Sequence, residues 1–205
     1  MLLPFDIETK VVGDHDEFPH PIFHRIRCNV GLVIPETSAG ECKFKIFEAP
    51  GEFFSFLDAK TPKIISFNGQ SFDMQVLIYE ALRQGVVADA YFNGGGKWAG
   101  YRNRYHDWHV DLLDELTNFG ACRRASLHDV CESMGIPGKL GVAGDDVDDL
   151  TDEQVVEYCK DDVCSTAVLG LRWLKFRGQK VPDEQMVVEV ASEAWRNRYF
   201  ELRGE

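Results

Sequence analysis

The features that this sequence lacks exclude several classes of protein. Its 205 residues contain no apolar run of the length that a membrane span needs, and the start, MLLPFD, lacks the basic segment of a signal peptide. The six cysteines form no C-x-x-C pair and no regular framework, and repeats and low-complexity segments are absent. We therefore expect a cytoplasmic protein that has no membrane partner and keeps its cysteines as small buried thiols.

Basic residues are also scarce. The chain has 22 lysines and arginines against 34 aspartates and glutamates, which gives a net charge of −12. A protein that coats nucleic acid nonspecifically needs clustered cations, so the charge argues against that class. It allows an enzyme that contacts a few nucleotides through metal ions and a local basic rim. An apolar content of 44% and an aromatic content of 12% are typical of a globular protein.

The pattern of apolar residues predicts an α/β fold with a mixed β-sheet flanked by helices. Strands are expected at 2–7, 28–35, 42–48, 63–67 and 109–113, and helices at 52–59, 71–83, 126–134, 152–176 and 184–201. Residues 10–27 and 85–106 are expected to be connections. We assign residues 1–176 to the main domain and residues 177–205 to a C-terminal helical extension packed on the same domain.

Two carboxylates stand in the first predicted strand, within the segment LLPFDIET. Asp6 and Glu8 are two residues apart, and strand side chains alternate, so both project from the same face. Burying two like charges without a partner is costly, and a cation between them removes the cost. Mg²⁺ and Mn²⁺ prefer oxygen ligands, which makes this pair a candidate metal site. A strand end with two solvated acids explains the pair equally well.

Two further acidic motifs follow. In the segment FNGQSFD, which joins a predicted strand to a helix, Asp73 falls in the first helical turn, where ordinary capping also favours an acid. In the segment YCKDD, Tyr158 and Asp162 are four residues apart and therefore share one face of the long helix. Asp161 points elsewhere and is expected to be solvated. Tyr158 taken alone is more often an aromatic at the edge of a core.

These motifs together resemble the three exonuclease motifs of the DEDDy 3′–5′ exonucleases in the ribonuclease H-like superfamily. The motifs are Asp6-x-Glu8, Asn68-x-x-x-Phe72-Asp73 and Tyr158-x-x-x-Asp162, in that order. The first and last resemble most closely the proofreading exonuclease of family B DNA polymerases. The segments SLHDV and GIPGK resemble a group of stand-alone exonucleases related to that domain. Where the sister class carries His, five residues before the last Asp, this chain carries Glu157.

The resemblance covers about residues 1–175 and implies a ribonuclease H-like exonuclease domain with two divalent metal ions, Mg²⁺ or Mn²⁺. It implies that Asp6 bridges both ions, that Glu8 and Asp162 complete the tighter site, and that Asp73 holds the second ion. Tyr158 then orients the attacking water. It also implies that Asn68 and Phe72 contact the terminal nucleotides; for Phe72, packing in the core is an alternative.

Other candidate contacts to nucleic acid are Lys97 and Arg102, in a loop where cations alternate with aromatics, and Lys139. Such a loop could follow a single strand by charge and stacking, but a surface loop whose aromatics return to the core is a slightly better interpretation. His109 and Asp111 are taken as structural.

The sequence thus favours a metal-dependent 3′–5′ exonuclease that acts on the 3′ end of single-stranded DNA and releases nucleoside 5′-monophosphates. Because nothing in the chain resembles a polymerase, we do not expect it to proofread in cis. An exoribonuclease of the same fold is one alternative, since the ribonuclease D-like branch shares the tyrosine. A noncatalytic nucleic-acid-binding module is the other.

Overall fold

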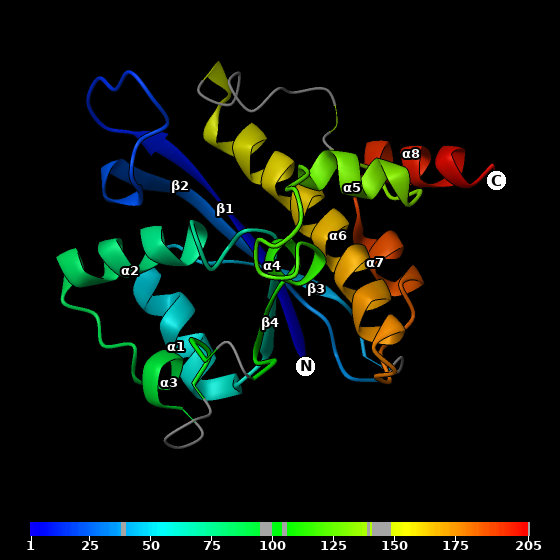
Figure 1. Ribbon diagram of the computed structural model, residues 1–205, viewed down its shortest axis with the longest axis horizontal. Coiled ribbons are helices and arrows are strands. Elements are labelled where there is room, and N and C mark those ends of the chain that lie inside the picture. Colours follow the sequence, from blue (N-terminus) through cyan, green and yellow to red (C-terminus); the bar gives the residue numbers. More distant parts are fainter. Residues whose placement is uncertain (38–39, 95–99, 104–105, 139, 141–148, 205) are drawn as a thin grey trace.

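The computed structural model describes residues 1–37, 40–94, 100–103, 106–138, 140 and 149–204, and its centre is a five-stranded mixed sheet (Figure 1). The strands are β1 (Leu2–Val11), β2 (His24–Val33), β3 (Lys43–Ile46), β4 (Lys63–Ser66) and β5 (His109–Asp111), in the order β3-β2-β1-β4-β5. The pairs β1–β2 and β2–β3 are antiparallel, whereas β1–β4 and β4–β5 are parallel. The predicted mixed α/β fold is confirmed.

Helices cover both faces of this sheet and bury a separate core on each. They are α1 (Pro50–Lys60), α2 (Asp73–Gln84), α3 (Asp89–Asn93), α4 (Leu112–Leu116), α5 (Leu127–Ser133), α6 (Asp152–Phe176), α7 (Gln185–Val190) and α8 (Glu193–Arg203). Figure 1 shows α1, α2 and α3 on one side and α5 to α8 on the other. Phe5 and Ile7 face the first group, and Val30 and Ile65 face the second. None of the described helices combines the length and apolarity that a membrane span requires.

Helix α6 lies close against the sheet because it carries a glycine at the crossing. A Cβ atom on Gly170 would lie 2.7 Å from Cγ2 of Ile65, so a larger residue would push the helix away from β4. The contacts of α6 extend across β4, β1 and β2. This packing holds the helix beside the middle of β1, where the acidic residues lie.

The connection predicted at 10–27 is wrong at both ends. Strand β1 continues to Val11 and β2 begins at His24, so the two strands form a long hairpin with a short 3₁₀ turn, Pro21–Phe23, near its tip. The register shifts between Glu8 and Thr9, a β-bulge that redirects the strand. Beyond the bulge the exposed strand ends carry mostly polar side chains, which hid the strands from a search for apolar runs.

Three further boundaries differ from the prediction. Helix α3 lies within the expected connection 85–106. Strand β5 ends at Asp111 because this side chain accepts a hydrogen bond from the N–H of Leu113 and caps α4. The single helix expected at 184–201 is two helices, α7 and α8, since Ser192 caps α8 through the N–H of Trp195.

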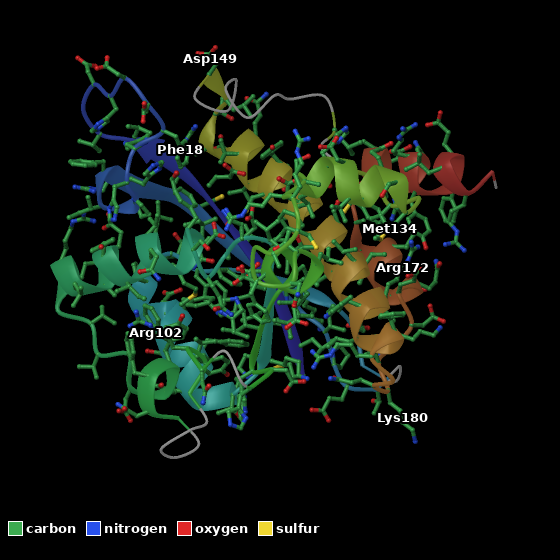
Figure 2. The ribbon with its side chains drawn as sticks, in the orientation of Figure 1. Phe18, Arg102, Met134, Asp149, Arg172 and Lys180 are labelled. Atoms are coloured by element: carbon green, nitrogen blue, oxygen red, sulfur yellow. The ribbon has the colours of Figure 1, made fainter. Side chains whose placement is uncertain are left out.

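The C-terminal helices fold back on α6. Trp195 is fully buried and its indole N–H donates to the hydroxyl of Ser165 over 3.0 Å. Arg172 forms a two-pronged ion pair with Glu184, at 2.7 Å and 2.9 Å. In Figure 2 Arg172 lies on the side of α6 that faces this region. Helices α7 and α8 thus share a core with α6. The division at residue 177 into a main domain and a C-terminal extension stays a proposal.

A capping box stabilises the start of α6. The side chain of Thr151 accepts the N–H of Gln154, and the side chain of Gln154 accepts the N–H of Thr151. Replacing Thr151 by Ala is expected to lower the free energy of unfolding by about 1 kcal/mol, because a helical N–H loses its acceptor. Urea denaturation measures this change; an unaltered midpoint would show that the cap contributes nothing.

Candidate active site

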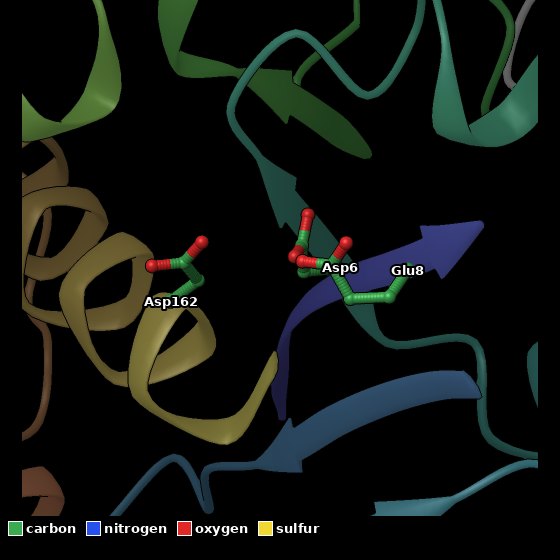
Figure 3. A group of neighbouring side chains, drawn as sticks. All are labelled: Asp6, Glu8 and Asp162. Carbon is green, nitrogen blue, oxygen red and sulfur yellow. The ribbon is translucent and has the colours of Figure 1, made fainter. Parts of the chain in front are cut away.

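Three carboxylates from two elements converge at the centre of the molecule. Asp6 and Glu8 project from the same face of β1, and Asp162 projects toward them from α6 (Figure 3). One oxygen atom of each lies within 4.8 Å of the others, which is a spacing that one cation can bridge. The strand alternation of β1 and the crossing of α6 therefore bring together three of the predicted metal ligands.

The electrostatic surroundings of Asp6 favour loss of its charge unless a cation is bound. Burial raises the pKa of Asp6 well above its usual value, and the negative charges of Asp73, Glu8 and Asp162 raise it further. Burial likewise raises the pKa of Asp73 to about 8, with Asp111 and Glu8 adding to the shift. Such raised values are expected where acids are gathered for a metal ion.

Asp73 reaches this region through a tight turn between β4 and α2. Asn68 adopts the left-handed conformation, with φ of 67°, which asparagine tolerates better than most residues. A Cβ on Gly69 would lie 2.5 Å from Ser66 and 3.1 Å from Oδ2 of Asp73, so the turn requires glycine. Asp73 itself is only 5% exposed.

Asp111 holds the same turn from the next strand. Its carboxylate accepts the N–H of Asn68 and the N–H of Gln70, both over 2.8 Å. Beside it the buried ring of His109 hydrogen-bonds the hydroxyl of Ser66 at 2.8 Å. These contacts agree with a structural role for His109 and Asp111. They also show that Asn68 serves the turn with its backbone, while its buried Oδ1 has no hydrogen-bond partner among the described residues.

Tyr158 lies one helical turn before Asp162 and is 8% exposed. Burial raises the pKa of its phenol, and the charges of Asp162, Glu8 and Asp6 act in the same direction. The phenol therefore stays protonated at neutral pH, so it can donate a hydrogen bond but cannot act as a strong base.

An exposed aromatic surface that the sequence interpretation missed lies beside Asp73. Phe72, immediately before Asp73, packs against the rings of His24 and Phe18, with centroids at 4.8 Å and 5.5 Å. Phe18 is 78% exposed, and Figure 2 shows it at the β1–β2 hairpin. Phe72 also packs against the core, which was one of its two predicted interpretations; its contact with a nucleotide stays a prediction. The only signal of this surface in the sequence is Phe18, an aromatic residue in a polar segment.

The remaining predicted contacts are less informative. Lys97 and Lys139 lie outside the described residues. Arg102 lies over the ring of Phe92 at 5.7 Å, on the side of the molecule that carries α1 and α3 (Figure 2). The expectation that Asp161 is solvated is wrong: the side chain is half-buried and hydrogen-bonded to Ser192, because the C-terminal helices pack over it.

The donor set fits a hard divalent cation. It consists of carboxylate oxygens, its members are partly or fully buried, and the acidic neighbours of Asp6 all raise its pKa. Mg²⁺ and Mn²⁺ prefer such ligands, and a bound cation would offset the repulsion within the cluster. Asp6, Glu8 and Asp162 could hold one ion, and Asp73 lies close enough to Asp6 to influence its charge.

Comparison with known proteins places this chain in a family. Residues 39–196 match the model of a family described as predicted 3′–5′ exonucleases related to the exonuclease domain of PolB. The chain belongs to this family. The match ends within α8, beyond the boundary predicted at residue 176, and it begins after Asp6 and Glu8. No curated protein is similar enough to the sequence to match it.

A solved structure supports the same fold. The family B DNA polymerase from the hyperthermophilic archaeon Pyrobaculum calidifontis superposes with a TM-score of 0.60 at 22% sequence identity. The alignment covers 98% of this chain and 28% of the polymerase, so the chain spans less than a third of that protein. The predicted ribonuclease H-like fold of the polymerase-exonuclease type is confirmed. Membership of the family implies a nucleic acid substrate.

Proposed function

We propose that this protein is a metal-dependent exonuclease that removes nucleotides from the 3′ end of single-stranded DNA and releases nucleoside 5′-monophosphates. The observation that supports it best is the convergence of Asp6, Glu8 and Asp162, with Tyr158 one turn away, in a member of an exonuclease family. The six cysteines are all unpaired, which fits a reducing cytoplasm as the place where it works.

Each residue has a defined task in this proposal. Asp6 would hold both of two cations, Glu8 and Asp162 the first, and Asp73 the second. Cations bound there would lower the pKa of the attacking water and neutralise charge on the phosphate. Tyr158 would hydrogen-bond the attacking water and aim it at the phosphorus atom. This division of tasks suits a phenol that stays protonated.

Single-stranded substrates suit the surface around the site better than duplexes. The net charge of −12 disfavours a long footprint on phosphates, whereas Phe18 and Phe72 offer aromatic rings on which unpaired bases can stack. DNA is the preferred substrate in the proposal because the family is related to a DNA polymerase domain. An exoribonuclease remains the second candidate, since the same carboxylates could act on a strand that contains deoxyribose or ribose.

The proposal is tested with a 5′-labelled oligonucleotide, supplied as single-stranded DNA, as duplex DNA and as RNA of the same sequence, with Mn²⁺ or Mg²⁺. We expect a ladder that shortens from the 3′ end on single-stranded DNA and stops when chelator is added. Faster degradation of RNA would establish the second candidate. Tight binding of every substrate without cleavage would contradict both and identify a binding module.

The variant Tyr158→Phe is expected to lower the single-turnover rate about 100-fold, because the ring remains and the group that orients the water is lost. Binding of Mn²⁺ should not change, since the phenol is not a proposed ligand. Rapid-quench kinetics at saturating enzyme measure the rate. An unchanged rate would remove Tyr158 from the proposed site.

The variant Phe18→Ala is expected to raise KM for single-stranded DNA about tenfold, since stacking of a base contributes about 1–3 kcal/mol. The rate at saturating substrate should change little. Phe176→Ala is the matched control, because Phe176 is 81% exposed at the far end of α6. Equal KM values for the two variants would show that the hairpin does not contact the substrate.

A further inference from the structure

Two thiols lie directly behind the acidic cluster, and no step proposed above uses them. Cys28 is the residue of β2 that pairs with Glu8, and Cys159 is on α6 next to Tyr158. Cys159 is fully buried and Cys28 is 6% exposed. The pair therefore joins the sheet to the helix at the point where the two elements bring the carboxylates together.

The contacts of these thiols lead to Asp6. The side chain of Cys28 contacts that of Cys159, and its S–H donates to the backbone oxygen of Val155 over 3.9 Å. The sulfur of Cys159 also lies 3.7 Å from Oδ2 of Asp6 and 3.5 Å from its backbone oxygen. Any change at the sulfur of Cys159 is thus transmitted to the carboxylate that is proposed to hold both cations.

Cys28, which is 6% exposed, is among the residues that line a cavity of about 490 Å³ between the outer edge of β2, the start of α1, the end of α2 and the start of α6. The cavity lies where β3 ends: β3 pairs only with Val30–Val33, so among the described residues no strand pairs with the preceding part of β2 on the edge away from β1. Arg25, Asn29 and Glu48 are among the residues around it. A molecule as small as hydrogen peroxide fits this space.

We propose that hydrogen peroxide oxidises Cys28 and Cys159 to a disulfide that reversibly inactivates the acidic cluster, an inference that rests on the proposed function for its effect on activity. The sulfur of Cys28 attacks the peroxide, the O–O bond breaks, and a sulfenic acid and one water form. The sulfur of Cys159 then displaces the sulfenic oxygen, and a second water leaves. Two thiols lose two hydrogens, and the peroxide is reduced to two waters.

The disulfide alters the site in two ways. The S–H of Cys159 no longer donates to Asp6, and the sulfur of Cys159 turns toward Cys28 to form a bond of about 2 Å, which changes its position against the carboxylate of Asp6. A dithiol restores both thiols by exchange, in keeping with the transient disulfides of reducing compartments.

The test uses the full chain with the exposed Cys122 replaced by Ser, which prevents cross-linking between molecules. After peroxide treatment, alkylation and digestion without reductant, mass spectrometry should find a peptide that joins Cys28 to Cys159. Exonuclease activity should fall about 10- to 100-fold, as for loss of a group that supports a metal ligand, and return with dithiothreitol. Cys28→Ser in this background should resist peroxide, whereas Cys42→Ser, which removes another buried thiol, should remain sensitive.

Two results with the oxidised protein and its variant would overturn the inference, and a third comes from metal binding. One is the absence of the Cys28–Cys159 peptide when other thiols are oxidised. The other is an equal loss of activity in the Cys28→Ser variant. The Mn²⁺-induced rise in melting temperature provides a readout that needs no catalysis: its loss on oxidation supports the inference and its retention contradicts it. A protein that binds Mn²⁺ but degrades no substrate would refute the exonuclease proposal separately.

Discussion

The variant Asp6→Asn is expected to lose about a thousandfold of the exonuclease rate while it keeps its fold. Asp6 has Glu8 and Asp162 within one cluster and also feels the charge of Asp73, so we propose it as the ligand that both cations would share. Metal ions contribute several kcal/mol to stabilising the charge of the transition state, and each 1.4 kcal/mol corresponds to a factor of ten. Initial rates on labelled single-stranded DNA at fixed Mn²⁺ measure the loss.

The same substitution should raise the melting temperature of the metal-free protein. Replacing a buried group usually destabilises a fold, but here the change removes an acid whose pKa is raised by Asp73, Glu8 and Asp162. Asp149→Asn, at an exposed position, is the matched control and should leave both rate and melting temperature unchanged. If Asp6→Asn retains the wild-type rate, the cluster is not the catalytic site.

Mn²⁺ is expected to raise the melting temperature of the wild-type protein, and the gain should increase with pH. A ligand present at 100 times its Kd stabilises the folded state by about 2.7 kcal/mol. The cation must displace the protons that Asp6 and Asp73 retain in the metal-free protein, so binding weakens as pH falls. Asp162→Asn, which removes one of the three clustered oxygen donors, should lose most of this gain.

The metal-free protein should show the opposite trend with pH. In the unfolded chain an aspartate titrates near its usual value of about 3.9, whereas the pKa of Asp73 in the folded protein is about 8. Between these values the folded state binds more protons than the unfolded state, so the free energy of unfolding falls as pH rises. Thermal unfolding with chelator across this range measures the slope. Asp73→Asn should flatten it, and a slope equal to that of the wild type would contradict the assignment.

The sequence predicts those parts of the site that depend on local backbone geometry. Strand alternation places Asp6 beside Glu8, and helical spacing places Tyr158 beside Asp162, so both relations can be read from residue numbers. The sheet could be predicted because apolar segments marked most of its strands. The hairpin beyond the bulge was missed, because polar residues such as Lys10, Arg25 and Arg27 interrupt its few apolar residues.

Relations between distant segments needed the structure. The pairing of Cys28 with Glu8 depends on a register that no local pattern reveals, and the contact of Phe18 with Phe72 depends on the path of the hairpin. The role of Asp111 is a similar case, because its carboxylate accepts hydrogen bonds from two N–H groups of a turn more than 40 residues earlier in the chain. The burial of Asp161 could not be predicted for the same reason, because the segment that covers it comes later in the chain.

The central claim is that these carboxylates hold divalent cations, and an anomalous difference map from a crystal soaked in Mn²⁺ tests it most directly. We predict one peak bounded by Asp6, Glu8 and Asp162 and a second between Asp6 and Asp73. An occupied Mn²⁺ site elsewhere, with none at this cluster in a protein that still degrades DNA, would contradict the account.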